Sequence, residues 1–312
     1  MDVLEGLESL TDQTRGCVLT VGNFEGVHMG HQRILQNARR LANVAGARTV
    51  VMTFEPTPAA LLIQDRRPEL ILPRELKFRL LGQCGADLVL LVKTSRDFLA
   101  TEPQAFVRDV LIGRIGPRHI VEGPNFFFGR ERAGSVETLR QLAAEGQYEL
   151  TVVDPVTMEL PGEGEVRVSS SLIRRLVRDG DVASAAKCLG RPFALYGRVV
   201  GGARRGRLLD FPTANLEPPV TVIPGNGVYA GWAETGAARY ASAVSVGTRP
   251  TFGPSSERAI EVHLLDASGD YYDQSMTVSF VARLRDQRKF PDAETLRAQI
   301  VKDVQRVREI CR

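Results

Sequence analysis

Histidine and cysteine are both scarce in this chain of 312 residues, which has four of each. The cysteines, Cys17, Cys84, Cys188 and Cys311, lie far apart in sequence and form no Cys-x-x-Cys pair. This spacing argues against a zinc site and a disulfide framework, and it favours a reducing compartment. The N-terminus also lacks the charged-then-apolar plan of a signal peptide. We therefore expect a cytoplasmic protein.

Long apolar runs and a strong net charge are missing as well. The longest apolar runs, such as residues 88–92, are far too short to span a bilayer, so we expect no membrane partner. The formal net charge is only +3, and without a long Lys/Arg block we expect no nucleic-acid partner. Mild basicity suits small anionic substrates equally well. We expect a monomer or a weak homo-oligomer.

The first half of the chain alternates short apolar runs with helical patterns. The runs typical of strands are residues 17–22, 48–54, 87–92, 119–122 and 148–153. The helical patterns are residues 31–45, 75–83, 103–112 and 136–144. Apolar strands that alternate with helices indicate a parallel sheet covered on both faces. The sequence therefore predicts an α/β domain over residues 1–186.

The pattern changes near residue 185. Two short helices are predicted over residues 169–177 and 182–189, and a terminal helix over residues 292–311. Between them, runs typical of strands follow one another without helices: residues 194–200, 227–233, 240–246, 259–265 and 276–284. This order indicates an antiparallel barrel or sandwich. The second predicted domain is residues 187–312.

Two of the four histidines, His28 and His31, lie three residues apart in the segment VGNFEGVHMGHQ (21–32). They follow the first predicted strand and open the first helix. Ligands of such sheets bind beyond the carboxyl ends of the strands, and a helix N-terminus suits phosphate. An ordinary polar helix cap is one alternative. A metal site is another, although no further His or Cys lies nearby in sequence to complete it.

A second segment, GRVVGGARRGRLLDFPTANL (197–216), combines glycines with arginines. Such a loop can fold around polyphosphate, and a surface turn is an equally good interpretation of the pattern alone. In an extended segment Thr213 and Asn215 project to one face. Their neutral oxygens suit a magnesium ion that takes most of its negative ligands from phosphates. The alternative is a strand edge with two ordinary polar residues.

These motifs resemble those of the bacterial bifunctional riboflavin kinase/FAD synthetases. VGNFEGVHMGHQ is similar to GxFDGVHxGHQ, and VVMTFEPTP (50–58), VEGPNFFFGRERAG (121–134) and VSSSLIRRLV (168–177) follow in family order. The second segment resembles GxxxGRxLGFPTAN, and VGTRPTFG (246–253) and AIEVHLLD (259–266) follow it. The resemblance implies a Rossmann-like nucleotidyltransferase domain of the HxGH type. It also implies an antiparallel β-barrel riboflavin kinase domain with a C-terminal helix.

Two ATP-dependent reactions are implied by this resemblance, with Mg²⁺ as cofactor. The C-terminal domain would phosphorylate riboflavin to FMN, and the N-terminal domain would adenylylate FMN to FAD with release of pyrophosphate. An FMN phosphate is already ionised at neutral pH, so its attack needs alignment and charge stabilisation but no protein base. The riboflavin hydroxyl is neutral, so its attack benefits from a general base.

The same resemblance implies a role for individual residues. The implied catalytic residues are Glu261, His28 and His31. Those implied to bind nucleotide or phosphate are Gly22, Asn23, Gly30, Ser170, Ser171, Arg174, Gly202, Gly206 and Arg207. Those implied to bind flavin are Asn125, Arg285 and Phe290, and those implied to bind the metal are Thr213 and Asn215. Alternation along the strand predicts that Ile260 and Val262 face the core while Glu261 points into the cleft.

Several positions depart from the family pattern, and four of them bear most on the function. Glu25 stands where aspartate is usual, Thr57 where histidine is usual, Pro124 where an acidic residue is common, and Asp210 where glycine precedes FPTAN. Glu25, Thr57 and Pro124 motivate an alternative in which only the kinase is active and the first domain is a degenerate nucleotide- or flavin-binding regulatory module. Another alternative is a cytidylyl- or pantetheine-type transferase that carries a flavin-sensing β domain.

Overall fold

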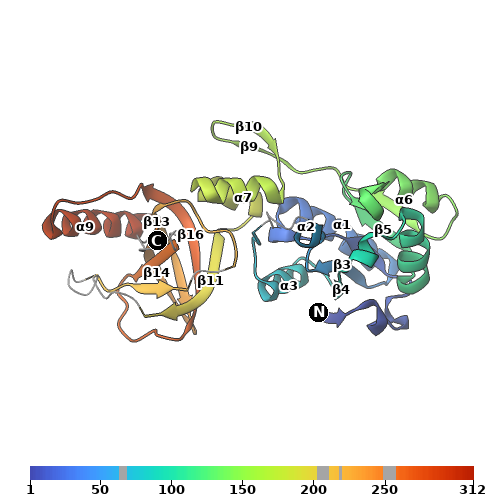
Figure 1. Cartoon of the computed structure of the whole chain (residues 1–312), viewed down its shortest axis with the longest axis horizontal. Helices are drawn as coiled ribbons and strands as arrows, with labels where there is room; N and C mark the ends of the chain where they lie inside the picture. The colour runs from blue at the N-terminus through green and yellow to red at the C-terminus, as the bar shows by residue number, and fades with distance from the viewer. Residues whose placement is uncertain (63–68, 202–210, 218–219, 249–257) are drawn as a thin grey trace. The chain divides into compact units, whose positions relative to one another are not determined.

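The computed structural model describes residues 1–62, 69–201, 211–217, 220–248 and 258–312. Contacts divide the chain into two compact units (Figure 1). Unit 1 comprises Met1–Pro68, Arg74–Glu159 and Glu163–Val168, and unit 2 comprises Glu69–Pro73, Leu160–Gly162 and Ser169–Arg312. Helices α7 (Ser170–Asp179) and α8 (Val182–Leu189) thus belong by contact to unit 2. The domain boundary at 186/187 stays a prediction.

Unit 1 is built on a six-stranded sheet in which neighbouring strands are parallel. In spatial order the strands are β1 (Asp2–Glu5), β4 (Leu88–Lys93), β3 (Thr49–Glu55), β2 (Val18–Val21), β5 (His119–Glu122) and β8 (Glu149–Val152). Side chains of β2, β3 and β4 are buried on both faces, which explains their continuous apolar runs. The strand order reverses direction between β2 and β5, so the topological switch point lies there.

Helices and short ribbons complete unit 1. They are α1 (Met29–Ala45), α2 (Pro58–Leu62), α3 (Arg74–Gln83), α4 (Arg96–Leu99), α5 (Pro103–Ala105), the π-helical segment η4 (Phe106–Ile115), α6 (Val136–Ala143) and the paired strands β6 (Phe127–Phe128) and β7 (Gly134–Ser135). Strands β9 (Thr157–Leu160) and β10 (Gly164–Arg167) form a separate two-stranded ribbon. Helix α1 packs Ala38 and Ala42 against β2 and β5 and ends at Gly46, whose φ of 60° is typical of a C-cap glycine.

Unit 2 contains a closed barrel in which neighbouring strands are antiparallel. Around the barrel the strands are β11 (Phe193–Val200), β12 (Ala214–Leu216), β15 (Arg258–Leu264), β14 (Ala238–Thr248), β13 (Gly227–Thr235) and β16 (Ser275–Arg285). The C-terminal helix α9 (Ala293–Ile310) packs Val307 into a cluster that includes Val228 and Leu284. In sequence, the barrel strands follow α7 and α8 and precede α9.

The predicted fold class is confirmed, and the second sheet closes as a barrel. Several details differ from the prediction, including the following two. The helix expected over residues 103–112 continues to Ile115 and is π-helical from Phe106, and β1 was not predicted. Only two of the four β1 residues, Val3 and Leu4, are apolar, so the sequence carries no clear strand pattern there.

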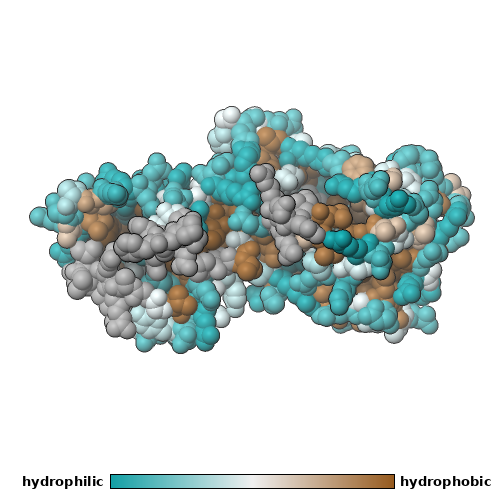
Figure 2. Space-filling model, in the orientation of Figure 1, coloured by the Kyte–Doolittle hydropathy of each residue, from teal (hydrophilic) through white to brown (hydrophobic). Residues whose placement is uncertain are grey.

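The face drawn in Figure 2 is mostly hydrophilic, with apolar side chains scattered among polar ones. Scattered apolar residues of this kind are normal on protein surfaces. Within the described ranges, no helix is both long and apolar enough to cross a membrane.

Candidate active sites

A strained turn after β2 places both motif histidines at the start of α1. Phe24, Gly26 and Val27 have φ angles of 49°, 78° and 39°, in the left-handed region. A β-branched residue such as Val27 rarely adopts this conformation. Strained backbone of this kind is found mostly at functional sites, where the surrounding structure holds it in place.

The two imidazole rings of this turn are stacked face to face. The ring centroids of His28 and His31 lie 3.6 Å apart, with 19° between the planes. The Nδ1 atom of His28 accepts the main-chain N–H of His31 at 3.4 Å and so caps α1. A Cβ atom at Gly30 would lie only 3.2 Å from the His28 ring. The glycine of HxGH therefore leaves room for the stacked pair.

His31 is held in its neutral form. Burial lowers its pKa well below the usual value of 6.5, and the nearby His28 and Lys77 lower the pKa further. Its Nδ1 atom is buried and has no hydrogen-bond partner among the described residues. Because an unsatisfied buried polar group costs roughly 1–3 kcal/mol, this atom marks a place where a ligand group is expected.

The remaining motif residues of unit 1 surround this turn. Gly22 is half-buried and Asn23 is exposed, whereas Glu25 is 6% exposed. Asn125 is exposed in the turn that follows β5. Because β2 and β5 are neighbours at the switch point, the histidine turn and the Asn125 turn leave adjoining strands.

Two buried side chains near the turn, Lys77 and Glu122, were given no role from the sequence. Lys77 is 6% exposed and Glu122 is 3% exposed. Glu122 lies within the motif segment 121–134 and Lys77 lies outside the motifs, and each falls within a predicted strand or helix. Only their contacts in the folded chain reveal that both reach the segment leading from β2 into the histidine turn.

The serine-rich motif forms the N-terminus of α7, in unit 2. Ser169 caps the helix by accepting the N–H of Leu172 at 3.2 Å, so Ser170 and Ser171 occupy the first turn. Arg174 donates from Nε to the main-chain oxygen of Glu69 at 2.6 Å. By contact, this motif therefore belongs to a different compact unit from the histidine turn.

In unit 2 the barrel register aligns several predicted residues in one row. Glu261 on β15 lies opposite Asn215 on β12 and Ser245 on β14. Ser245 lies opposite Val228 on β13, which in turn lies opposite Arg285 on β16. Side chains directly opposite each other across strands share one face of the sheet. The fold thus brings the expected base, a metal-binding residue and a flavin-binding residue onto one face.

The strand that carries Glu261 alternates as expected. Ile260 and Val262 are buried at 1% and 0% exposure, while Glu261 between them is half-buried. The carboxylate therefore lies on the face opposite the one that these two side chains bury.

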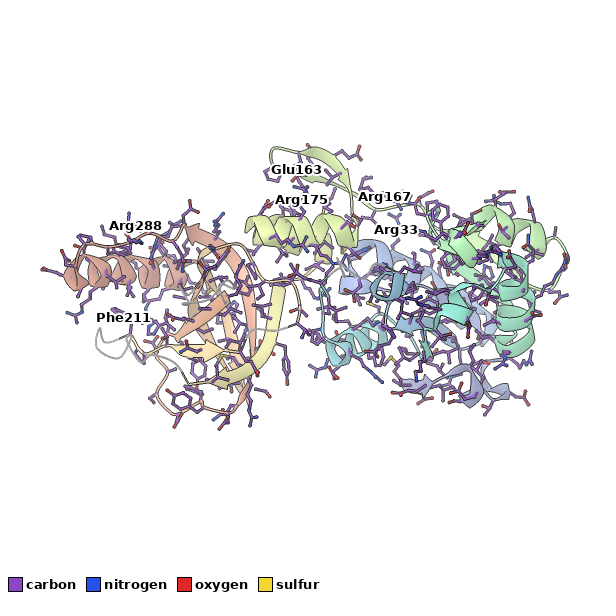
Figure 3. All side chains as sticks on the ribbon, viewed as in Figure 1. Arg33, Glu163, Arg167, Arg175, Phe211 and Arg288 are labelled. Atoms are coloured by element: carbon purple, nitrogen blue, oxygen red, sulfur yellow. The ribbon has the colours of Figure 1, made fainter. Side chains whose placement is uncertain are left out.

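A cationic pocket lies at one end of this row. Its lining includes Val228, Ser245, Arg285, Gln287, Arg288 and Phe290. The guanidinium carbons of Arg285 and Arg288 lie 5.7 Å and 4.9 Å from the Phe290 ring centroid. Helix α9 supports both arginines, since Arg285 binds the Asp303 carboxylate through Nε and Nη2 and Arg288 donates to Gln299. Figure 3 shows Arg288 beside α9.

A second pocket of unit 2 lies beside Thr213. Its lining includes Pro212, Thr213, Ala214, Gly269, Tyr271 and Tyr272. His263 fixes the segment that forms it, because its Nδ1 atom lies 2.8 Å from the Pro212 oxygen and its ring meets Phe211 edge-on. The predicted residues Gly202, Gly206 and Arg207, and the departure Asp210, lie outside the described residues.

Both halves of the chain match known families. The FAD synthetase model matches residues 10–172, and the riboflavin kinase model matches residues 189–311. A bifunctional riboflavin kinase/FMN adenylyltransferase of Escherichia coli K12 is 35% identical over 313 residues, covering 99% of this chain and 97% of that protein. The chain belongs to the bifunctional riboflavin kinase/FMN adenylyltransferase family. It is a transferase with both activities.

Further relatives agree over most of the length. The Bacillus subtilis bifunctional riboflavin kinase/FMN adenylyltransferase is 34% identical and covers 92% of this chain and 90% of that protein. A solved structure described as a macrolide-efflux protein from Streptococcus pneumoniae has a TM-score of 0.88 at 30% identity and covers 99% of both chains. The match to the FAD synthetase model favours two activities over the kinase-only alternative.

Proposed function

We propose that adenylyl transfer to FMN takes place at the stacked histidines of unit 1. The observation that carries this proposal is the buried Nδ1 atom of His31 at a helix N-terminus, which has no hydrogen-bond partner in the part of the chain that the structure describes. A neutral imidazole donates a hydrogen bond without carrying charge, and α1 adds main-chain N–H groups and a partial positive charge. This set of groups suits the phosphates of ATP.

Alignment is the main requirement of this reaction. An oxygen of the FMN phosphate attacks the α-phosphorus of ATP. The bond between that phosphorus and the oxygen that bridges to the β-phosphate breaks, and pyrophosphate leaves. No proton has to move, because the attacking oxygen is already ionised. His28 and His31 stabilise the charge that develops on the phosphoryl oxygens. Asn125, on the adjoining turn, contributes to flavin binding.

Several residues complete this proposed site. Gly22, Asn23 and Gly30 let the main chain approach the nucleotide, while Ser170, Ser171 and Arg174, at the start of α7 in unit 2, keep their sequence-based assignment to phosphate. The departures fit a working site. Glu25 is buried and the reaction requires no acid or base there, and Pro124 is exposed next to Asn125.

Riboflavin phosphorylation is assigned to the row of residues on the barrel. Glu261 takes the proton of the 5′-hydroxyl, the oxygen attacks the γ-phosphorus of ATP, and ADP leaves. The pocket around Phe290 offers an aromatic face and two arginines for the isoalloxazine ring. The pocket formed by Tyr271 and Tyr272 beside Thr213 suits the adenine base.

The donor set beside Glu261 fits Mg²⁺. Thr213 and Asn215 offer neutral oxygens, and the phosphates of ATP supply the negative ligands that this ion also requires. When bound, Mg²⁺ neutralises charge on the transferred phosphoryl group. Glu261 lies opposite Asn215 in the barrel register, which supports this assignment. Gly202, Gly206 and Arg207, in the glycine-rich segment, are assigned to binding of the ATP polyphosphate by sequence alone.

Product analysis tests both assignments together. Riboflavin incubated with Mg-ATP and the protein is expected to give FMN first and FAD afterwards, separated by chromatography. Accumulation of FMN without FAD would contradict the proposed adenylyl site. Riboflavin left unconsumed, while FMN supplied in a separate sample is converted to FAD, would contradict the proposed kinase site.

The setting of these reactions also remains a proposal. All four cysteines are free thiols, and three of them are buried, which suits the reducing cytoplasm. We keep the expectation of a monomer or weak homo-oligomer without a nucleic-acid partner. Light scattering at micromolar concentration measures the first, and a stable dimer or larger assembly there would overturn it.

A further inference from the structure

Two buried ionisable side chains hold the three-residue segment Val21–Asn23, which leads from β2 into the histidine turn. At its start, the main-chain N–H of Val21 donates to Oε1 of Glu122 at 2.5 Å. At its end, the main-chain oxygen of Asn23 accepts from Nζ of Lys77 at 3.4 Å. Glu122 comes from β5 and Lys77 from α3, so the segment is fixed from two sides.

At the topological switch point, the Glu122 side chain takes the place of a main-chain hydrogen-bond partner between β2 and β5. Strands β2 and β5 pair at two positions, Val18 with His119 and Leu19 with Ile120. Continuing that register would bring Val21 opposite Glu122, and there the side-chain carboxyl accepts the N–H instead. Thr20 also lies within reach, with its hydroxyl 3.5 Å from the same oxygen. The carboxyl thus fills the place where the two strands separate.

Lys77 forms the other half of the arrangement. Its ammonium group also donates to the Thr53 hydroxyl at 3.3 Å, and that hydroxyl donates to the Asn23 oxygen at 3.4 Å. The charge of Lys77 also reaches the turn itself, since it contributes to lowering the pKa of His31. Burial lowers the pKa of Lys77, whereas Glu25 and Glu55 act in the opposite direction.

Neither side chain is explained by packing. Burying an ionisable group is unfavourable, and an apolar side chain of similar volume often serves a protein core as well or better. Burial raises the pKa of Glu122 well above its usual value, and the hydrogen bonds from Val21 and Thr20 oppose that rise only in part. Whatever its protonation state, the group accepts the N–H of Val21 through Oε1.

We propose that Glu122 and Lys77 are positioning residues for adenylyl transfer, which fix Val21–Asn23 and thereby set the stacked histidines against the phosphates of ATP. Lys77 in addition supplies positive charge beneath that turn. This inference rests on the proposed role of the histidine turn. It concerns groups that act through Asn23, Val21 and the histidines, without touching the substrate.

Four variants of the full chain test the proposal, with riboflavin phosphorylation in unit 2 as the internal standard. Lys77→Met removes the donors and the charge, and Lys77→Arg keeps a cation. Glu122→Val removes the acceptor, and Glu122→Gln keeps it without an ionisable group. Arg79→Met, on an exposed part of α3, is the matched control and is expected to leave both activities unchanged.

Kinetics with separate ATP and FMN titrations give the readout. Loss of a hydrogen bond to a charged group predicts that Lys77→Met lowers kcat/KM for ATP in FAD formation about 10- to 100-fold. The effect should lie mainly in the KM for ATP, with Lys77→Arg recovering part of it. The kcat/KM for ATP should fall by about 10-fold in Glu122→Val and by at most about 3-fold in Glu122→Gln.

Three outcomes overturn the proposal. One is an unchanged KM for ATP in Lys77→Met together with a lower kcat, because that result indicates a smaller fraction of molecules with a folded unit 1. A second is equal loss in Glu122→Val and Glu122→Gln, and a third is an equal fall of both activities in every variant. Full FAD formation by His31→Ala would instead overturn the proposed function of the histidine turn, so the two failures are distinguishable.

Discussion

The two active sites solve different problems of alignment. In unit 1 the proposed functional groups lie on a strained turn, where the two imidazole rings are stacked. In unit 2 they lie in a row across regular barrel strands, and the half-buried carboxylate of Glu261 lies among them. The difference follows from the nucleophile, because an ionised phosphate needs charge stabilisation whereas a neutral hydroxyl needs a base.

The means of support differ as well. The turn in unit 1 is held by single hydrogen bonds to the buried Glu122 and Lys77. Arg285, proposed to lie beside the flavin in unit 2, is held by a paired contact to Asp303, whose side chain is 5% exposed. A paired contact between charged groups is stronger and more directional than a single hydrogen bond. The comparison predicts that activity at the histidine turn depends mainly on the position of the main chain. Activity at the barrel site should depend mainly on the pairing of Arg285 with Asp303.

The largest effect is expected from Glu261→Gln. Removal of a general base lowers phosphoryl transfer about 10²- to 10⁴-fold, while FAD formation from supplied FMN should stay at the parent rate. Initial rates with riboflavin and with FMN as separate substrates measure both. Unchanged phosphorylation of riboflavin would remove Glu261 as the base.

A somewhat smaller effect is expected from His31→Ala. Loss of one donor that stabilises charge on the transferred group lowers adenylyl transfer about 10²- to 10³-fold. Riboflavin phosphorylation should be spared, because Glu261 and its neighbours lie in unit 2. Parallel loss of FMN formation in the same samples would contradict independent sites.

Asp303→Asn sharpens the comparison of supports. It leaves the half-buried Arg285 without its charge partner, and breaking a buried pair costs at most about 3–5 kcal/mol. A lower melting temperature and a raised KM for riboflavin are expected, with the KM for FMN in adenylyl transfer unchanged. The matched control is Asp266→Asn, which removes an exposed pair with Arg308 of the same helix. Equal destabilisation by both variants would contradict the distinction between buried and exposed pairs.

The smallest effect concerns pH. The folded-state pKa of Glu122 is raised by burial, so between the unfolded pKa and the folded pKa the folded chain binds more protons. Rising pH through that window therefore lowers the stability of unit 1, by at most about 1.4 kcal/mol per pH unit. Glu122→Gln should remove this dependence. Amide hydrogen exchange of β2 and α1 measures it, and identical pH profiles for parent and variant would contradict the assignment.

Much of the fold was predictable because its signals are local. The predicted strand over residues 119–122 is β5 to the residue, and the first helix begins at Met29 instead of His31. Barrel closure was only one of two alternatives, because register depends on pairing between distant strands. The alignment of Asn215, Glu261 and Arg285 in one row also depends on this register, so the sequence could not predict it, although the motifs name each residue.

The supports of the histidine turn were not predictable at all. Lys77 lies 54 positions after Asn23 in sequence, and Glu122 lies 101 positions after Val21. Lys77 is one of several charged residues of α3, and Glu122 ends the short strand β5, so neither stands out in the sequence as buried. A buried charge is visible only once the fold shows which side chains are enclosed.

Complementation between two inactive variants tests the central claim most directly. His31→Ala and Glu261→Gln are each incubated alone and then mixed, with riboflavin and Mg-ATP, and FAD is measured over time. Alone, His31→Ala should stop at FMN and Glu261→Gln should leave riboflavin unused, whereas the mixture should form FAD after a lag while FMN accumulates. A mixture that forms no FAD, although His31→Ala supplies FMN, would contradict two sites with separate residues.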